Sequence, residues 1–198
     1  MAGVILASGS AVRRRLLAEA GVDFATETAD ENEAEIKNRM RNDGCSVDDT
    51  ALSLARAKAE AVARKHAGVY VIGADQMLEQ GGRWFDKPED RAEARRHLQS
   101  FSGRSHRLIT AVSVVAGGAE VWHTVETATL HVRELSNEFI DDYLDAVGDA
   151  ASASVGAYQL ESLGIQLFER IDGDYFTILG LPLVRLLAFL RQHGLMAA

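Results

Sequence analysis

The chain has 198 residues, of which 47% are hydrophobic and 25% charged, ordinary values for a globular protein that can bury a core. Its formal net charge of −8 disfavours polyanionic partners, so we expect no binding to nucleic acid or to an anionic membrane. The single cysteine excludes an intrachain disulfide, and no segment is apolar for long enough to span a bilayer. We therefore expect a cytoplasmic protein with one domain, residues 1–198.

Hydrophobic periodicity predicts strands and helices that alternate in the first half of the chain. The polar, acidic stretch from residue 30 to residue 49 interrupts them, and we expect it to form an excursion over a cleft. A Gly-Gly pair at residues 81 and 82 predicts a hairpin turn. The predicted elements are strands over residues 4–7, 24–28, 69–74, 77–79 and 83–85, and helices over residues 11–20 and 47–66.

The second half of the chain has the pattern of antiparallel hairpins. Gly117-Gly118 predicts the turn between two long strands, and Ser136 is placed to cap a helix. Pro182 opens the last helix and Gly194 ends it. The predicted elements are helices over residues 90–101, 136–145 and 182–193, and strands over residues 107–115, 120–132, 155–160 and 165–171. The predicted fold class is a mixed α/β sheet flanked by helices.

The junction between the first strand and the first helix suits an anion. Ser8 and Ser10 surround a glycine, Ser10 occupies the expected N-cap, and arginines 13–15 fill the first helical turn. Cations at a helix N-terminus oppose the macrodipole unless an anion lies between them. Amide, hydroxyl and guanidinium groups would together bind a phosphate chain. The alternative is a basic first turn exposed to solvent.

Several carboxylates and lysines are candidates for catalysis. Asp75 follows a buried strand, where open α/β sheets place their ligands, and can hold a divalent cation or orient water. Glu33 cannot be told by spacing from the other carboxylates of residues 30–35. Lys58 lies among small residues of a helix, and Lys87 closes a hairpin as either a phosphate contact or a turn residue. Without a Ser or Cys nucleophile motif, this set favours metal-assisted attack of water on a phosphoanhydride.

The motifs together resemble those of the Maf nucleoside triphosphate pyrophosphatases, in order and over nearly the whole chain. They are Leu6-Ala7-Ser8-x-Ser10 with Arg13, Leu54-Ala55-x-x-Lys58-Ala59, Ile72-Gly73-Ala74-Asp75, Lys87-Pro88, Ser102-Gly103-Arg104-x-His106 with Thr110, Gly156-Ala157-Tyr158, and Gly173-Asp174-Tyr175 through Gly180-Leu181-Pro182-Leu183. The resemblance implies two lobes around a deep nucleotide cleft, as in inosine triphosphatases, and a possible homodimer. It also implies hydrolysis of nucleoside triphosphates to monophosphate and pyrophosphate with a divalent cation, Mg²⁺ or Mn²⁺, and a link to cell-division arrest.

Carried over to this chain, the resemblance assigns roles to individual residues. It implies catalytic roles for Asp75, Glu33, Lys58 and Lys87, metal binding by Asp75 and Glu33, and substrate contacts by Ser8, Ser10 and Arg13. Val12, Gln76 and Glu161 depart from the common pattern at positions that set base specificity. They are similar to the branch that acts on 7-methyl-GTP. Three further hypotheses remain open: a dTTP/UTP pyrophosphatase, a catalytically weak septum-formation regulator, and a nucleic-acid-binding module, which the net charge disfavours.

Overall fold

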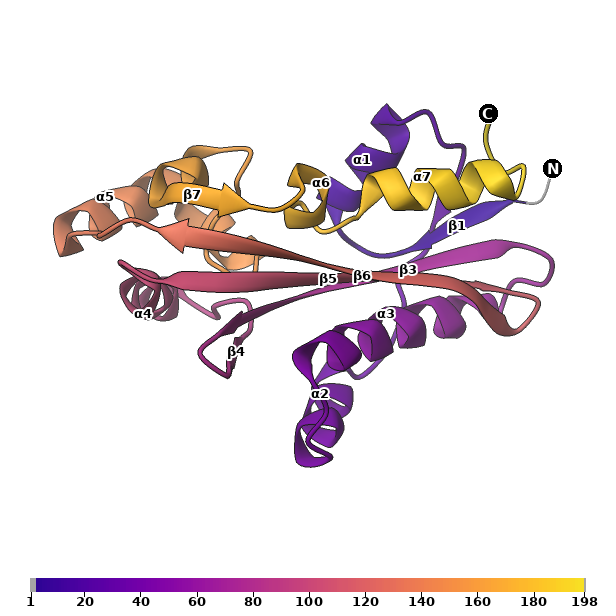
Figure 1. Cartoon of the computed structure of the whole chain (residues 1–198), viewed down its shortest axis with the longest axis horizontal. Helices are drawn as coiled ribbons and strands as arrows, with labels where there is room; N and C mark the ends of the chain where they lie inside the picture. The colour runs from indigo at the N-terminus through magenta and orange to yellow at the C-terminus, as the bar shows by residue number, and fades with distance from the viewer. Residues whose placement is uncertain (1–2, 198) are drawn as a thin grey trace. The chain divides into compact units, whose positions relative to one another are not determined.

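A computed structural model describes residues 3–197 and contains a mixed, seven-stranded sheet flanked by helices (Figure 1). The strand order is β2-β1-β3-β5-β6-β7, and β4 pairs with β3. β1 runs parallel to β2 and β3, whereas β3–β4 and β6–β7 are antiparallel. The predicted fold class is therefore confirmed. The strands are β1 (Val4–Ala7), β2 (Ala25–Thr26), β3 (Tyr70–Gln80), β4 (Arg83–Phe85), β5 (Ser105–Ala116), β6 (Ala119–Val132) and β7 (Phe168–Asp172).

The α-helices of the described chain are α1 (Ala11–Glu19), α2 (Glu33–Asn42), α3 (Val47–Ala63), α4 (Arg91–Phe101), α5 (Asn137–Val147), α6 (Tyr175–Ile178) and α7 (Leu183–Gln192). Two 3₁₀-helices, η1 (Gly148–Ala153) and η2 (Leu163–Leu167), follow α5. Side-chain oxygens of Ser10, Ser46 and Ser136 cap α1, α3 and α5, because each accepts a hydrogen bond from a backbone N–H of the first turn. Among residues 3–197, no helix combines the length and apolar character that crossing a bilayer requires.

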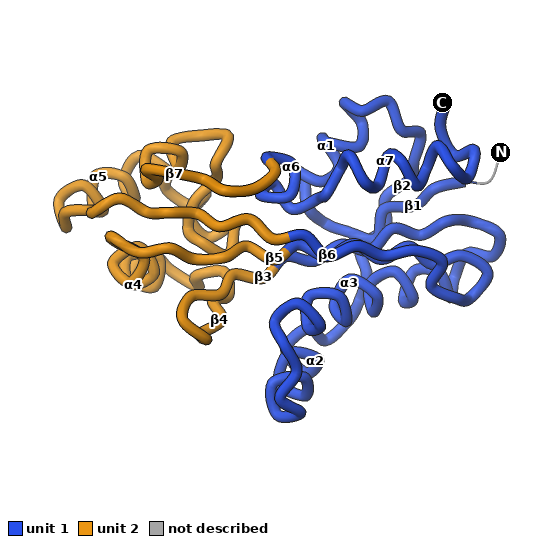
Figure 2. The backbone as a smooth tube through the Cα atoms, in the orientation of Figure 1, with its two compact units in different colours: residues 1–76, 110–126, 175–198 blue, residues 77–109, 127–174 orange. Residues whose placement is uncertain are grey.

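The chain divides into two compact units (Figure 2). The first unit comprises residues up to 76, residues 110–126 and residues from 175 on; the second comprises residues 77–109 and 127–174. In the first unit, alternate residues of the central strands face opposite layers of helices. Leu6 and Ile72 pack in one apolar cluster with Leu17 of α1 and Leu186 of α7. Their strand neighbours Ile5, Ala7 and Val71 lie on the opposite face of the sheet. There they pack in a second cluster with Ala59 and Val62 of α3.

The second unit has an aromatic core. His106 lies fully inside it, with its Nε2 2.7 Å from the Tyr158 hydroxyl and its ring close to Phe101 and Phe168. Within the described chain, the Nδ1 atom of His106 is buried without a hydrogen-bond partner. Burial lowers the pKa of His106 from 6.5 to about 3, so the imidazole is neutral at neutral pH.

Because His106 is buried in its neutral form, we expect the free energy of unfolding to fall in mild acid. Between pH 6.5 and 5 the unfolded chain protonates residue 106, whereas the folded chain does not, so the free energy of unfolding falls as pH falls. The slope of about 1.4 kcal/mol per pH unit gives a loss of about 2 kcal/mol by pH 5. Urea unfolding at pH 7 and pH 5 measures it, and His106→Gln should remove most of that loss. An equal loss in the variant would contradict the prediction.

The acidic stretch over residues 30–49, which we predict as an excursion over a cleft, contains a helix that the sequence does not predict. Residues 33–42 form α2, which Asn32 caps by accepting a hydrogen bond from the N–H of Glu35 at 3.2 Å. Glutamates in its first turn and arginines in its last turn both favour the helix dipole. Charge placement at the helix ends therefore compensates for the weak apolar pattern, which leaves only Ile36 buried.

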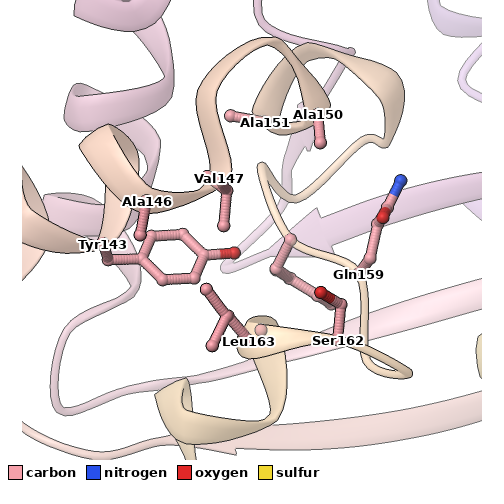
Figure 3. A pocket seen from close by; sticks show the side chains of 10 residues that line it. Tyr143, Ala146, Val147, Ala150, Ala151, Gln159, Ser162 and Leu163 are labelled. Atoms are coloured by element: carbon pink, nitrogen blue, oxygen red, sulfur yellow. The ribbon is translucent and has the colours of Figure 1, made fainter.

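In the second unit, one strand prediction is wrong and another is only partly confirmed. Residues 155–160 form turns, and residues 163–167 form η2, so that only β7 remains of the second predicted strand. Ala157 has a φ of +60°, which a β-strand does not allow. The Tyr143 hydroxyl donates a hydrogen bond to the carbonyl oxygen of Ala157 at 3.2 Å and stabilises this turn. The turn borders a pocket of about 150 Å³ whose side chains are drawn in Figure 3 and whose walls come from Tyr143, Ala146, Val147, Ala150, Ala151, Tyr158, Gln159, Ser162, Leu163 and Gly164.

Candidate active site

The first strand and helix meet in a loop that serine hydroxyls organise. The Ser8 Oγ accepts a hydrogen bond from the N–H of Ser10 at 3.2 Å. Ser10 is extended, and its Oγ accepts from the N–H of Arg13 at 3.3 Å, which makes it the N-cap of α1. The strand–loop–helix junction and the role of Ser10 in it, both predicted from the sequence, are confirmed.

Arg13 turns inward from the first turn of α1. Its Nε donates to the carbonyl oxygen of Gly180 at 2.7 Å, and its Nη1 donates to the carbonyl oxygen of Ala74 at 2.9 Å and to the Ser8 Oγ at 3.3 Å. Burial lowers the pKa of the guanidinium, and the negative charge of Asp75 opposes that shift. Arg13 thus joins three segments of the first unit, while its Nη2 takes part in none of these bonds. The neighbouring Arg14 and Arg15 are exposed.

One lysine joins two of the predicted catalytic carboxylates. The Lys58 Nζ lies 2.5 Å from a carboxylate oxygen of Asp75 and 2.8 Å from one of Glu33. Asp75 is buried, with 6% of its surface exposed, whereas about half of the Glu33 side chain is exposed. Buried charges in proteins are almost always paired, so Asp75 depends on this contact. The structure therefore brings together Asp75, Lys58 and Glu33, as the sequence predicts.

Close packing of α3 on β3 allows the lysine to reach the aspartate. A Cβ atom built on Gly73 would lie 2.1 Å from the carbonyl oxygen of Ala55 and 2.7 Å from the backbone nitrogen of Ala59. Only glycine fits at this crossing. The apolar pattern predicts that Asp75 follows the end of a strand, but β3 continues through it to Gln80. Asp75 is thus a residue of the sheet itself, which holds its carboxylate more rigidly than a loop would.

The carboxylate pair fits a divalent cation that also binds phosphate. Oxygen donors suit Mg²⁺ and Mn²⁺, and Mg²⁺ is commonly held by one or two carboxylates together with substrate phosphates. Among residues 3–197, no group of three His, Cys, Asp or Glu side chains could hold a metal ion. Asp75 and Glu33 converge on a single cationic atom, the Lys58 Nζ, so this pair already accommodates positive charge. The donor set therefore fits Mg²⁺ or Mn²⁺ with phosphate oxygens as the remaining ligands.

The sequence matches known proteins over nearly its whole length. A family model described as "Maf-like protein" matches residues 3–193. The chain belongs to the Maf family. A nucleoside triphosphate pyrophosphatase from Granulibacter bethesdensis is 49% identical over 190 residues, 96% of each chain. A 7-methyl-GTP pyrophosphatase from Rhizobium meliloti is 50% identical over 191 residues, 96% of each chain, and one from Brucella suis biovar 1 is 49% identical over 190 residues, also 96% of each chain.

The remaining predicted residues of this Maf protein divide between the two units. In the first unit, Val12 is half-buried against the apolar cluster, and the Gln76 amide donates hydrogen bonds within the protein. In the second unit, Lys87 follows β4 and is exposed, and Glu161 is exposed in the turn that precedes η2. The roles of Lys87 in phosphate binding and of Glu161 in base selection stay predictions.

Sequence reasoning missed the backbone acceptors of this Maf protein. The carbonyl oxygens of Ala74 and Gly180 hold Arg13, and no side-chain pattern reveals a carbonyl. Sequence reasoning also gave no role to Thr110, which is fully buried in β5. Its signal is a hydroxyl within the apolar run of residues 108–115, because a buried polar group has to find a hydrogen-bond partner.

Proposed function

We propose that this protein hydrolyses nucleoside triphosphates to nucleoside monophosphate and pyrophosphate. The observation that carries the proposal is the pairing of Lys58 with Asp75 and Glu33. The carboxylates suit water activation and metal binding, and the ammonium suits a polyphosphate. Two relatives that are about half identical over 96% of their length carry the names nucleoside triphosphate pyrophosphatase and 7-methyl-GTP pyrophosphatase.

In the proposed reaction, water attacks a phosphorus atom of the triphosphate. Asp75 orients the water and accepts its proton, a new phosphorus–oxygen bond forms on the monophosphate, and the bond to the departing pyrophosphate breaks. Ser8 and Arg13 are proposed to bind phosphate oxygens, because a hydroxyl and a half-buried guanidinium both donate to anions. Lys58 stabilises the negative charge that develops as the bond breaks.

Asp75 and Glu33 would also hold the divalent cation. When bound, Mg²⁺ or Mn²⁺ would neutralise phosphate charge and polarise the phosphoryl group. The protein's own contribution is to bring two carboxylates, one from α2 and one from β3, to the same atom, the Lys58 Nζ. Its contact with Lys58 distinguishes Glu33 from a nearby acidic residue, Glu31, which pairs with Arg64 instead.

We further propose a preference for 7-methyl-GTP, or another modified guanine nucleotide, over dTTP and UTP. The Glu161 carboxylate can accept two hydrogen bonds from the N1–H and exocyclic amine of guanine. Uracil and thymine offer one such donor beside carbonyl oxygens, which a carboxylate repels. Methylation at N7 adds positive charge that a carboxylate favours. Val12, in place of the family's usual side chain, leaves apolar space for a large base.

Replacing Glu161 with Gln should narrow the gap between 7-methyl-GTP and UTP. The amide can donate to pyrimidine carbonyls and accepts only one hydrogen bond from guanine, so the selectivity ratio should fall roughly ten- to hundred-fold. Values of kcat/KM for both nucleotides test this. Glu169→Gln, the same change at an exposed residue of β7, is the control and should leave the ratio unchanged. A wild-type preference for UTP or dTTP would contradict the specificity and leave the reaction class intact.

A panel of nucleotides also tests for a pyrimidine-specific enzyme and for a division regulator. A dTTP/UTP pyrophosphatase would give its highest kcat/KM with those two nucleotides. A regulator that has lost catalysis would release pyrophosphate from none of the panel. We expect turnover of every nucleotide, because the carboxylates and the lysine that contact one another all remain in this chain.

A further inference from the structure

Gln76, next to the proposed catalytic aspartate, directs its amide nitrogen at a threonine hydroxyl and at two backbone carbonyl oxygens. Its Nε2 donates to the Thr110 Oγ1 at 2.9 Å and contacts the carbonyl oxygens of Thr177 at 3.1 Å and Ile178 at 3.0 Å. The Thr110 Oγ1 donates in turn to the same Thr177 carbonyl oxygen at 2.9 Å. One amide and one hydroxyl, both from the sheet, are therefore directed at the end of α6.

The segment that Gln76 and Thr110 contact, residues 177–180, is the tight C-terminal end of α6. The N–H of Gly180 bonds to the carbonyl oxygen of Thr177, and the N–H of Leu181 bonds to that of Phe176, the two nested bonds of a Schellman motif. Gly180 has a φ of +95°, a conformation that L side chains rarely adopt. A Cβ atom at this position would lie 3.3 Å from the Arg13 Nε. The turn is therefore shaped to bring its backbone close to the guanidinium.

This turn supplies the carbonyl oxygen that holds Arg13. The Gly180 carbonyl accepts the Arg13 Nε at 2.7 Å, the shortest of the three bonds that the guanidinium makes here. A chain of direct contacts thus runs from Gln76 through Thr177 and the turn to Arg13. Each of these residues belongs to the first unit.

We infer that Gln76 is a positioning residue: it fixes the 177–180 turn, and through the Gly180 carbonyl it fixes Arg13 for contact with the triphosphate. The inference rests on the proposed function for the role of Arg13. It assigns to Gln76 a task different from base selection, and the two tasks predict different kinetics. A residue that acts through Arg13 affects contacts with the triphosphate chain, which all nucleotides share, so its loss lowers kcat/KM by the same factor for each of them. A residue that reads the base changes the ratio between nucleotides.

Gln76→Met tests the inference, because methionine nearly matches glutamine in size and cannot donate the hydrogen bonds. We expect kcat/KM to fall about 10- to 100-fold for GTP, 7-methyl-GTP, dTTP and UTP alike, with ratios between them unchanged within about threefold. Gln80→Met is the matched control on the same strand. Among the described residues, the Nε2 of Gln80 is buried without a hydrogen-bond partner, so the control should retain wild-type kcat/KM.

A double variant shows whether the effect passes through Arg13. Arg13→Lys removes the donor to Gly180, so adding Gln76→Met to it should cost less than about twofold more. A general loss of structure would instead multiply the two losses. Thr110→Val, which removes the other donor to Thr177 with little change in shape, should give the same uniform loss if Gln76→Met does not fold.

Three results would overturn the inference: a selectivity change above about tenfold in Gln76→Met, equal rates in Gln76→Met and Gln80→Met, or multiplicative losses in the double variant. Failure of the proposed function gives a different result. Full activity of Arg13→Lys would contradict the role of Arg13 itself, whereas a slow Arg13→Lys beside an unaffected Gln76→Met would contradict the positioning role alone.

Discussion

Asp75→Asn is expected to lower kcat/KM by about 10²- to 10⁴-fold while leaving the fold intact. Asparagine has nearly the same shape and can still accept a hydrogen bond from the Lys58 Nζ, which lies 2.5 Å from the aspartate carboxylate. It cannot take a proton from water, and its charge no longer attracts a divalent cation. Pyrophosphate release under saturating Mg²⁺ measures the loss, and the melting temperature reports on the fold.

The control for this variant is Asp23→Asn, the same change at an exposed aspartate of the first unit. It should retain the wild-type rate. If purified, folded Asp75→Asn keeps more than about a tenth of that rate, Asp75 does not activate the water.

Gly73→Ala should give the largest loss of stability among the glycine-to-alanine changes in this chain. The new Cβ would meet the carbonyl oxygen of Ala55 at 2.1 Å and the backbone nitrogen of Ala59 at 2.7 Å. Both atoms belong to the α3 backbone and cannot turn aside, so α3 has to move off β3. Overpacking of this kind costs about 3 kcal/mol, and urea unfolding measures it.

Gly3→Ala is the matched control, because its Cβ would lie 3.6 Å from the nearest atom, an ordinary contact with Val69. Its free energy of unfolding should stay within about 0.5 kcal/mol of wild type. The displacement of α3 in Gly73→Ala also carries Lys58 away from Asp75, so its catalytic rate should fall even at temperatures where it is folded. A stable and fully active Gly73→Ala would contradict the packing that places the site.

Elements with a strong periodic pattern could be predicted from the sequence. The apolar run of β1, the serine cap of α1 and the two glycine-pair hairpins have local causes, and each lies where predicted. The helix α2 could not be predicted, because it buries a single residue and depends on charges at its ends. The turn at Ala157 could not be predicted either, since a positive φ at alanine depends on a tertiary hydrogen bond from Tyr143.

In the candidate site, too, some residues could be predicted from the sequence and others could not. Lys58 and Asp75 could be named from their neighbours and are found in contact. Glu33 could be singled out among the acidic residues only through the resemblance, because its partner is 25 positions away in the sequence. Arg13 was predicted to face a phosphate, but its three backbone and serine acceptors come from segments that the fold brings together. Spacing along the chain cannot reveal such contacts.

The most direct test of the proposed reaction is the identity of the products. The wild-type protein is incubated with GTP or 7-methyl-GTP and Mg²⁺, and phosphorus NMR quantifies every phosphate species over time. We expect nucleoside monophosphate and pyrophosphate in equal amounts, at a rate that Asp75→Asn lowers by at least about 100-fold. Nucleoside diphosphate with orthophosphate, or a product rate that Asp75→Asn leaves unchanged, would contradict it.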